Sequence, residues 1–170
     1  MKTYIRYVFL FCIFLFLQVF LARKVDLGFG IQLFLLPLFI MLLPFQTNVF
    51  TLMALGFILG LLADSLMNSY GLNASSLVLF AYLRPLIFRT FTPKEGYDIL
   101  KTPILFDMGW TWFIFSYGAL LFIYIFWFFF IEIFRLSEWF LILRNGLFSL
   151  FFSFIIALIV QLFFPKQSLS

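Results

Sequence analysis

Long, uninterrupted runs of apolar residues dominate this chain, and only short polar connections separate them. Six such runs occupy residues 7–22, 29–45, 49–66, 73–89, 110–133 and 146–164. Their lengths are close to the roughly 17 to 25 residues that an α-helix needs to cross the hydrocarbon core of a bilayer. The pattern therefore predicts one all-α polytopic membrane domain over residues 1–170, with about six transmembrane helices.

Prolines and short polar turns predict where these helices bend and end. Pro37 lies near the middle of the second run, where its missing N–H and its ring should kink a helix. Only residues 46–48 separate the second run from the third, so these two should form a tight antiparallel hairpin with Asn48 as the N-cap. Asn73 should cap the fourth helix. Residues 89–107 form the one substantial loop.

The basic residues are distributed unevenly between the two predicted sides of the membrane. With six spans, seven of the eleven fall on the side of both termini: Lys2, Arg6, Arg84, Arg89, Lys94, Lys101 and Lys166. Because lysine and arginine concentrate in cytoplasmic loops, we expect both termini in the cytoplasm of a multi-pass inner-membrane protein. The first run resembles a signal peptide but has no small-residue cleavage site, so we expect it to be retained.

Composition supports the membrane assignment and excludes several kinds of chemistry. Of the 170 residues, 65% are hydrophobic and 11% are charged, against about 25% charged residues in an ordinary soluble domain. The chain has no histidine, which removes the usual general base and the commonest metal ligand. The single cysteine, Cys12, can build neither an intrachain disulfide nor a cysteine-based metal site. We therefore expect no enzymatic activity, no cofactor, no metal and no nucleic-acid partner.

The third run carries the most specific pattern in the chain. Gly56, Gly60 and Asp64 follow one another at intervals of four residues and so share one face of a helix. Helices in lipid associate through close packing, which small residues permit. This face can therefore pack against a helix of the same chain or bind a second membrane protein.

Two ionisable residues lie within the apolar runs, Asp64 and Arg84. A charge at the bilayer centre costs about 2.5 to 3.5 kcal/mol, so each needs a partner or a route to water. The helical rise places them more than ~10 Å apart in depth, so we do not expect them to pair. Arg84 should snorkel to the cytoplasmic surface, or give polar support within the bundle as Asn73 could. Asp64 is either a simple interfacial or capping acid or has partners on its own side: Arg23, Lys24, Ser65, Asn68, Ser69 and Asn73.

The segment around the glycines resembles the central signature of the rod shape-determining protein MreD family. The similarity is sharp over residues 54–65, which contain Gly56, Gly60 and Asp64, and over the small-residue turn that contains Gly71. It implies a non-enzymatic scaffold of the bacterial elongasome, which supports cell shape and side-wall peptidoglycan synthesis. It also implies that these four residues serve helix packing or partner binding.

The same resemblance implies partners. An MreC-like bitopic protein is the expected direct partner, with a RodA-like glycosyltransferase and a class B penicillin-binding transpeptidase nearby, MreB filaments acting indirectly, and membrane lipids around the helices. The closest alternative is the substrate-binding component of an energy-coupling-factor vitamin transporter, which has a related helical plan. Such components usually carry a small-residue stripe in the first helix, whereas residues 7–22 are bulky almost throughout.

Overall fold

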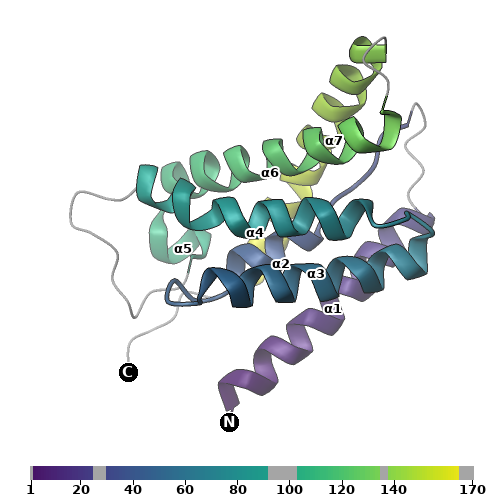
Figure 1. Ribbon diagram of the computed structural model, residues 1–170. Coiled ribbons are helices and arrows are strands. Elements are labelled where there is room, and N and C mark those ends of the chain that lie inside the picture. Colours follow the sequence, from purple (N-terminus) through teal and green to yellow (C-terminus); the bar gives the residue numbers. More distant parts are fainter. Residues whose placement is uncertain (1, 25–29, 92–102, 135–137, 165–170) are drawn as a thin grey trace.

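A computed structural model describes residues 2–24, 30–91, 103–134 and 138–164 of the chain. Within these ranges all regular structure is helical, as predicted (Figure 1). The helices are α1 (Lys2–Lys24), α2 (Leu36–Leu42), α3 (Val49–Met67), α4 (Leu72–Thr90), α5 (Leu105–Met108), α6 (Trp110–Ile133) and α7 (Trp139–Leu162).

Helix α4 is central in the bundle, because it contacts α2, α3 and α6 (Figure 1). Helix α1 lies against α2 and α3, and α7 lies against α6. At one end of the bundle the rings of Phe45, Phe88 and Trp112 meet with centroids 5.1 to 6.1 Å apart. We call this the Trp112 end. The opposite end holds the turn from α3 to α4 and is called the Asp64 end.

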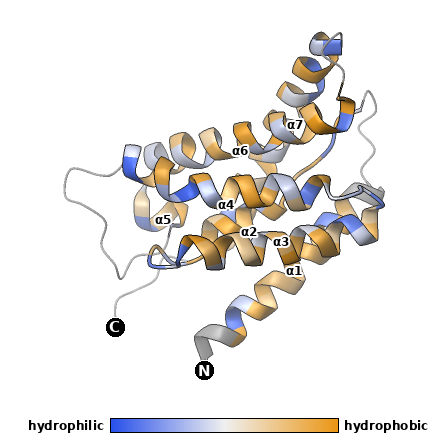
Figure 2. Cartoon of the chain, viewed as in Figure 1, coloured by the Kyte–Doolittle hydropathy of each residue, from blue (hydrophilic) through white to orange (hydrophobic). Residues whose placement is uncertain are grey.

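Most residues of the helices are hydrophobic (Figure 2), and many large apolar and aromatic side chains on the outside of the bundle are exposed. Helices α3, α6 and α7 are each long and apolar enough to cross a membrane, and α1 contributes the shorter apolar stretch Ile5–Leu21. Large rings such as Phe16 and Phe151 are mostly exposed. A soluble monomer rarely exposes so much contiguous apolar surface, so these features fit a helical membrane protein. Six crossings stay a prediction.

The second predicted span, residues 29–45, is not one continuous helix. Residues 31–35 are non-helical, and the seven residues of α2 are all buried. Pro37 lies in the first turn of α2, where its missing N–H removes no hydrogen bond. The predicted kinked helix is therefore wrong, since this proline begins a helix instead of bending one.

Serine side chains of α7 satisfy part of the non-helical backbone. The Ser149 hydroxyl accepts from the N–H of Gln32 at 3.0 Å, and the Ser153 hydroxyl accepts from the N–H of Phe34 at 2.9 Å. Non-helical backbone at membrane depth is tolerated only where protein or enclosed water supplies such partners. These two serines thus explain why this segment need not be helical.

Gln18 of α1 holds the same segment from the other side. Its Oε1 accepts from the N–H of Leu35 at 2.6 Å, and its Nε2 donates to the carbonyl of Leu33 at 2.7 Å. Both bonds are buried, and the Gln18 side chain is fully enclosed. The segment is therefore pinned between α1 and α7.

The remaining helix ends agree with the predictions to different degrees. Asn48 is the N-cap of α3, as predicted, and its side chain accepts from the N–H of Phe50 at 3.1 Å. Helix α7 begins at Trp139, earlier than the predicted start at residue 146. Residues 92–102 of the predicted long loop lie outside the described residues.

Candidate functional site

The small-residue face of α3 packs against α4 of the same chain. A methyl group placed on Gly60 would lie 2.4 Å from the Cα of Ala74, and one placed on Gly56 would lie 3.1 Å from the carbonyl oxygen of Leu77. Carbon atoms do not approach backbone this closely, so the contact needs glycine at Gly60 and leaves almost no space at Gly56. This face is covered by α4 and is not open to lipid.

Asp64 lies at the end of that face and caps α4. Its side chain is 5% exposed. Oδ1 accepts from the N–H of Asn73 at 3.0 Å, and Oδ2 accepts from the N–H of Ala74 at 2.9 Å. These N–H groups belong to the first turn of α4, where a helix has no internal acceptors and favours a negative charge. The structure therefore has the capping acid, and it also has two of the same-side partners expected for Asp64, Ser69 and Asn73.

Side chains from the α3–α4 turn, from α4 and from α6 complete what we call the Asp64 network. Ser69 Oγ donates to Asp64 Oδ1 at 2.6 Å, and Asn73 Nδ2 donates to the same oxygen at 2.9 Å. The Tyr124 hydroxyl of α6 donates to Asn73 Oδ1 at 2.9 Å. The network of Asp64, Ser69, Asn73, Ala74 and Tyr124 therefore joins α3, α4 and α6.

Asn73 is not the N-cap of α4, contrary to the prediction. Gly71 occupies the N-cap position and makes no side-chain cap, and Asn73 follows inside the first turn. The prediction failed because the carboxylate of Asp64 reaches across from α3 and takes the capping role. The Asn73 amide is then available to link Asp64 to α6.

Gly71 differs from the two glycines within α3. Its φ is +88°, and a methyl group there would meet nothing within 4 Å. Asn68 and Tyr70 in the same turn also have positive φ, at 57° and 48°. Glycine adopts such a conformation without steric strain. Gly71 thus shapes the turn that brings the start of α4 back to Asp64.

Arg84 of α4 is buried against the C-terminal end of α2, and its side chain is only 2% exposed. Its Nη2 donates to the carbonyl of Met41 at 3.2 Å, to that of Pro44 at 3.5 Å, and to that of Leu43. Its guanidinium carbon lies 4.7 Å from the centre of the Phe88 ring. The expectation that Arg84 snorkels to the surface is wrong, because the free carbonyls at the end of α2 hold it inside.

Asp64 and Arg84 take their partners from different parts of the bundle, so the expectation that they do not pair is confirmed. The side chains of Arg23 and Lys24, which were alternative partners for Asp64, lie outside the described residues. Within the described part of the chain, the carboxylate of Asp64 bonds only to neutral groups.

Sequence analysis missed a stripe of small and polar residues along α7. They are spaced four residues apart and all are buried: Asn145, Ser149, Ser153, Ala157 and Gln161. Gln161 Oε1 accepts from the N–H of Leu105 at 3.3 Å, which holds α5 against the end of α7. The spacing was a usable signal, because polar residues on one face of an apolar helix mark the side that faces protein.

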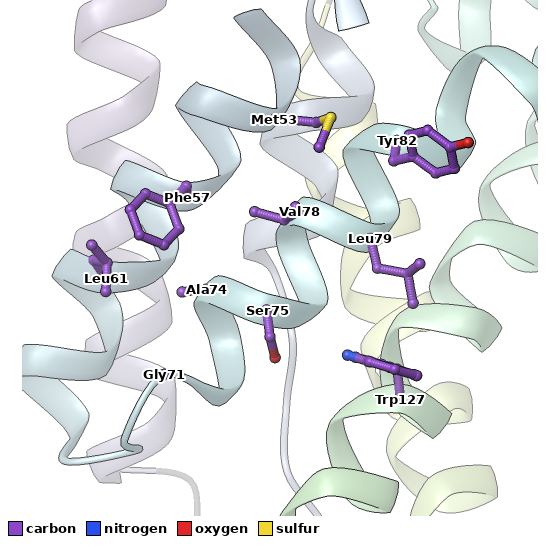
Figure 3. A pocket seen from close by; sticks show the side chains of 10 residues that line it. All are labelled: Met53, Phe57, Leu61, Gly71, Ala74, Ser75, Val78, Leu79, Tyr82 and Trp127. Carbon is purple, nitrogen blue, oxygen red and sulfur yellow. The ribbon is translucent and has the colours of Figure 1, made fainter. Parts of the chain in front are cut away.

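Two hollows lie beside the Asp64 network. One of about 580 Å³ opens at the Asp64 end and is partly polar; Gln32 Nε2 donates there to Glu132 Oε1 at 3.0 Å. The other is an apolar groove of about 540 Å³ over α4 (Figure 3). Ala74 and Val78 lie between Phe57 on α3 and Trp127 on α6. We call it the α4 groove.

No protein-family model, no curated protein and no solved structure matches this chain.

Proposed function

We propose that the protein is an MreD-like, non-enzymatic scaffold of the bacterial elongasome, which holds partners together in the inner membrane during side-wall peptidoglycan synthesis. The carrying observation is that Gly56, Gly60 and Asp64 all serve the close contact of α3 with α4. Their polar groups are paired within the chain, so they have no free group to offer to a substrate. A close helix contact with fully paired polar groups makes the bundle rigid, which suits a membrane scaffold.

Partners would then bind on the outward face of the α3–α4 hairpin. The α4 groove has Ala74 on its floor, and a small residue lets a foreign helix approach closely. We propose that the transmembrane helix of an MreC-like bitopic protein occupies it. A RodA-like glycosyltransferase and a class B penicillin-binding transpeptidase would join this pair, and MreB filaments would act indirectly.

We propose six membrane crossings with both termini in the cytoplasm. The bundle encloses the segments that are too polar or too irregular to face lipid. Arg84 of α4 and the backbone of residues 31–35 both find their partners inside the protein. The Trp112 end would face the cytoplasm, because the predicted excess of basic residues falls on that side.

Affinity purification of the tagged chain in mild detergent tests this function. We expect an MreC-like protein or a class B transpeptidase to co-purify. The variant Val78→Trp fills the α4 groove and should remove the MreC-like partner, whereas Leu55→Trp, on another face of α3, should retain it. Purification of a folded, membrane-inserted protein with neither partner would contradict the proposal.

A second candidate, the substrate-binding component of a vitamin transporter, is favoured by the partly polar hollow at the Asp64 end. Its volume of about 580 Å³ is within the roughly 300 to 1,000 Å³ of small-molecule sites. Gln32 and Glu132 provide an amide and a carboxylate there. A vitamin that co-purifies and is lost in Glu132→Ala would favour this function over the scaffold.

A further inference from the structure

A second groove lies between α1, α2 and α3, on a different face from the α4 groove. Its volume is about 520 Å³, and apolar side chains of all three helices form its body. Val8 and Phe11 come from α1, Leu43 from the end of α2, and Leu55 from α3. We call it the α1 groove. Its body has the chemistry of a site for a hydrocarbon chain.

The mouth of the α1 groove carries three polar side chains that can donate hydrogen bonds. Tyr7, Gln46 and Thr51 line it near the Trp112 end. Within the described part of the chain, the Tyr7 hydroxyl and the Gln46 amide make no hydrogen bond. Gln46 and Thr51 are exposed. These groups are therefore free to donate to an acceptor that enters the mouth.

Two arginines lie close to residues of this mouth. Arg6 is exposed and directly precedes Tyr7. Arg84 lies behind the wall, where it donates to the carbonyls of Leu43 and Pro44, and both of these residues line the groove. No acidic residue is among the described residues that line it. The charge of the mouth thus complements an anion.

We propose that the α1 groove binds an anionic phospholipid, with an acyl chain along its apolar body and the phosphate at the donors of its mouth. An apolar body whose mouth carries hydrogen-bond donors and has two arginines nearby matches a phospholipid better than a soluble anion or a partner helix. A soluble phosphate would leave the body unfilled, and an apolar helix would leave the donors without acceptors. This inference does not depend on the proposed scaffold function.

Native mass spectrometry of the detergent-purified full chain tests the headgroup. The protein is titrated with phosphatidylglycerol or with phosphatidylcholine of identical acyl chains. We expect the first phosphatidylglycerol to bind at least several-fold more tightly. The variant Arg6→Gln should lower that preference about fivefold, because a basic side chain near an anionic headgroup contributes about that factor. Equal binding of the two lipids would overturn the proposal.

Groove-filling variants test the position of the acyl chain. The larger side chains of Leu55→Trp and Val8→Trp would fill the α1 groove from α3 and from α1. Each variant should reduce the binding of both lipids several-fold. Val8 is 65% exposed, so its variant should fold even if Leu55→Trp does not. Val78→Trp, which fills the α4 groove, is the matched control and should leave lipid binding unchanged.

Two further outcomes would also overturn the proposal. One is lipid binding that stays unchanged in a folded groove-filling variant. The other is displacement of the lipid by glycerol phosphate at equal concentration, which would indicate a site for a soluble phosphate. Loss of the MreC-like partner with lipid binding intact would contradict only the scaffold function.

Discussion

At the scale of single residues, Asp64 shows how a buried charge can be stable within an apolar helix bundle. Its two oxygens accept four hydrogen bonds, two of them from the backbone N–H groups that begin α4. Hydrogen bonds to a charged acceptor are about twice as strong as neutral ones. The carboxylate therefore acts as a structural link between α3 and α4.

Replacing the carboxylate by an amide should weaken this link. In Asp64→Asn one oxygen becomes a donor, so the N–H of Ala74 or of Asn73 loses its acceptor. We expect a loss of about 1 to 3 kcal/mol of stability, the cost of an unpaired buried group. Thermal unfolding of the detergent-purified protein measures it. Ser65→Ala is the control, since the exposed Ser65 hydroxyl bonds only to the carbonyl of Leu61; an equal loss in both variants would contradict the argument.

Gly60 should tolerate no side chain at all. In Gly60→Ala the added methyl group meets the Cα and N of Ala74 at 2.4 and 2.6 Å, so α3 and α4 must separate. Overpacking of this kind costs about 1 to 3 kcal/mol, which the same thermal unfolding measures.

A matched control separates this clash from the general effect of replacing glycine. Gly118→Ala should be nearly neutral, because its methyl group would meet only the Phe154 side chain at 3.7 Å. Ala74→Gly should not rescue Gly60→Ala, because the clash is with backbone atoms. Rescue by that second change would show that the contact is not the one described.

At the scale of elements, the apolar pattern predicted well the helices that keep an exposed face and failed at α2, whose residues are all buried. The third and fifth runs correspond closely to α3 and α6. Residues 29–45 have the same apolar composition for another reason: in the described part of this segment, residues 30–45, most side chains are buried inside the protein. Hydropathy reports removal from water and does not distinguish lipid from protein interior.

The error at α2 also explains the error at Arg84. Of the carbonyls that hold the guanidinium, that of Met41 is free because α2 ends at Leu42. A helix that continued to residue 45 would pair the Met41 carbonyl with the N–H of Phe45, so the predicted helix hid this acceptor. By contrast, the sequence showed the four-residue spacing of Gly56, Gly60 and Asp64. It did not show which helix packs against them.

The serines of α7 should decide whether residues 31–35 stay in place. In Ser149→Ala combined with Ser153→Ala, the N–H groups of Gln32 and Phe34 lose their acceptors. We expect a loss of about 1 to 3 kcal/mol for each. Amide hydrogen exchange should become faster in residues 31–35. Ser75→Ala is the control, because the Ser75 hydroxyl bonds within α4 to the carbonyl of Leu72. In this variant the hydrogen exchange of residues 31–35 should be unchanged.

At the scale of the whole molecule, the two ends of the bundle carry different groups. The Asp64 end holds the network that joins α3, α4 and α6, and the Trp112 end holds the mouth of the α1 groove. The proposed orientation would direct that mouth to the cytoplasmic leaflet, whose lipids are often anionic. The lipid proposal and the topology are therefore mutually consistent but are tested separately.

Cysteine labelling in intact cells tests the proposed orientation. In a Cys12→Ser background, Tyr70→Cys places a thiol at the Asp64 end, where Tyr70 is 97% exposed, and Gln46→Cys places one at the Trp112 end. If the basic residues set the topology, a membrane-impermeant maleimide reaches residue 70 from outside but residue 46 only after permeabilisation. The reverse pattern would show that the protein has the opposite orientation in the membrane. Labelling of both residues from outside would contradict six crossings, because α3 would then not separate the two sites.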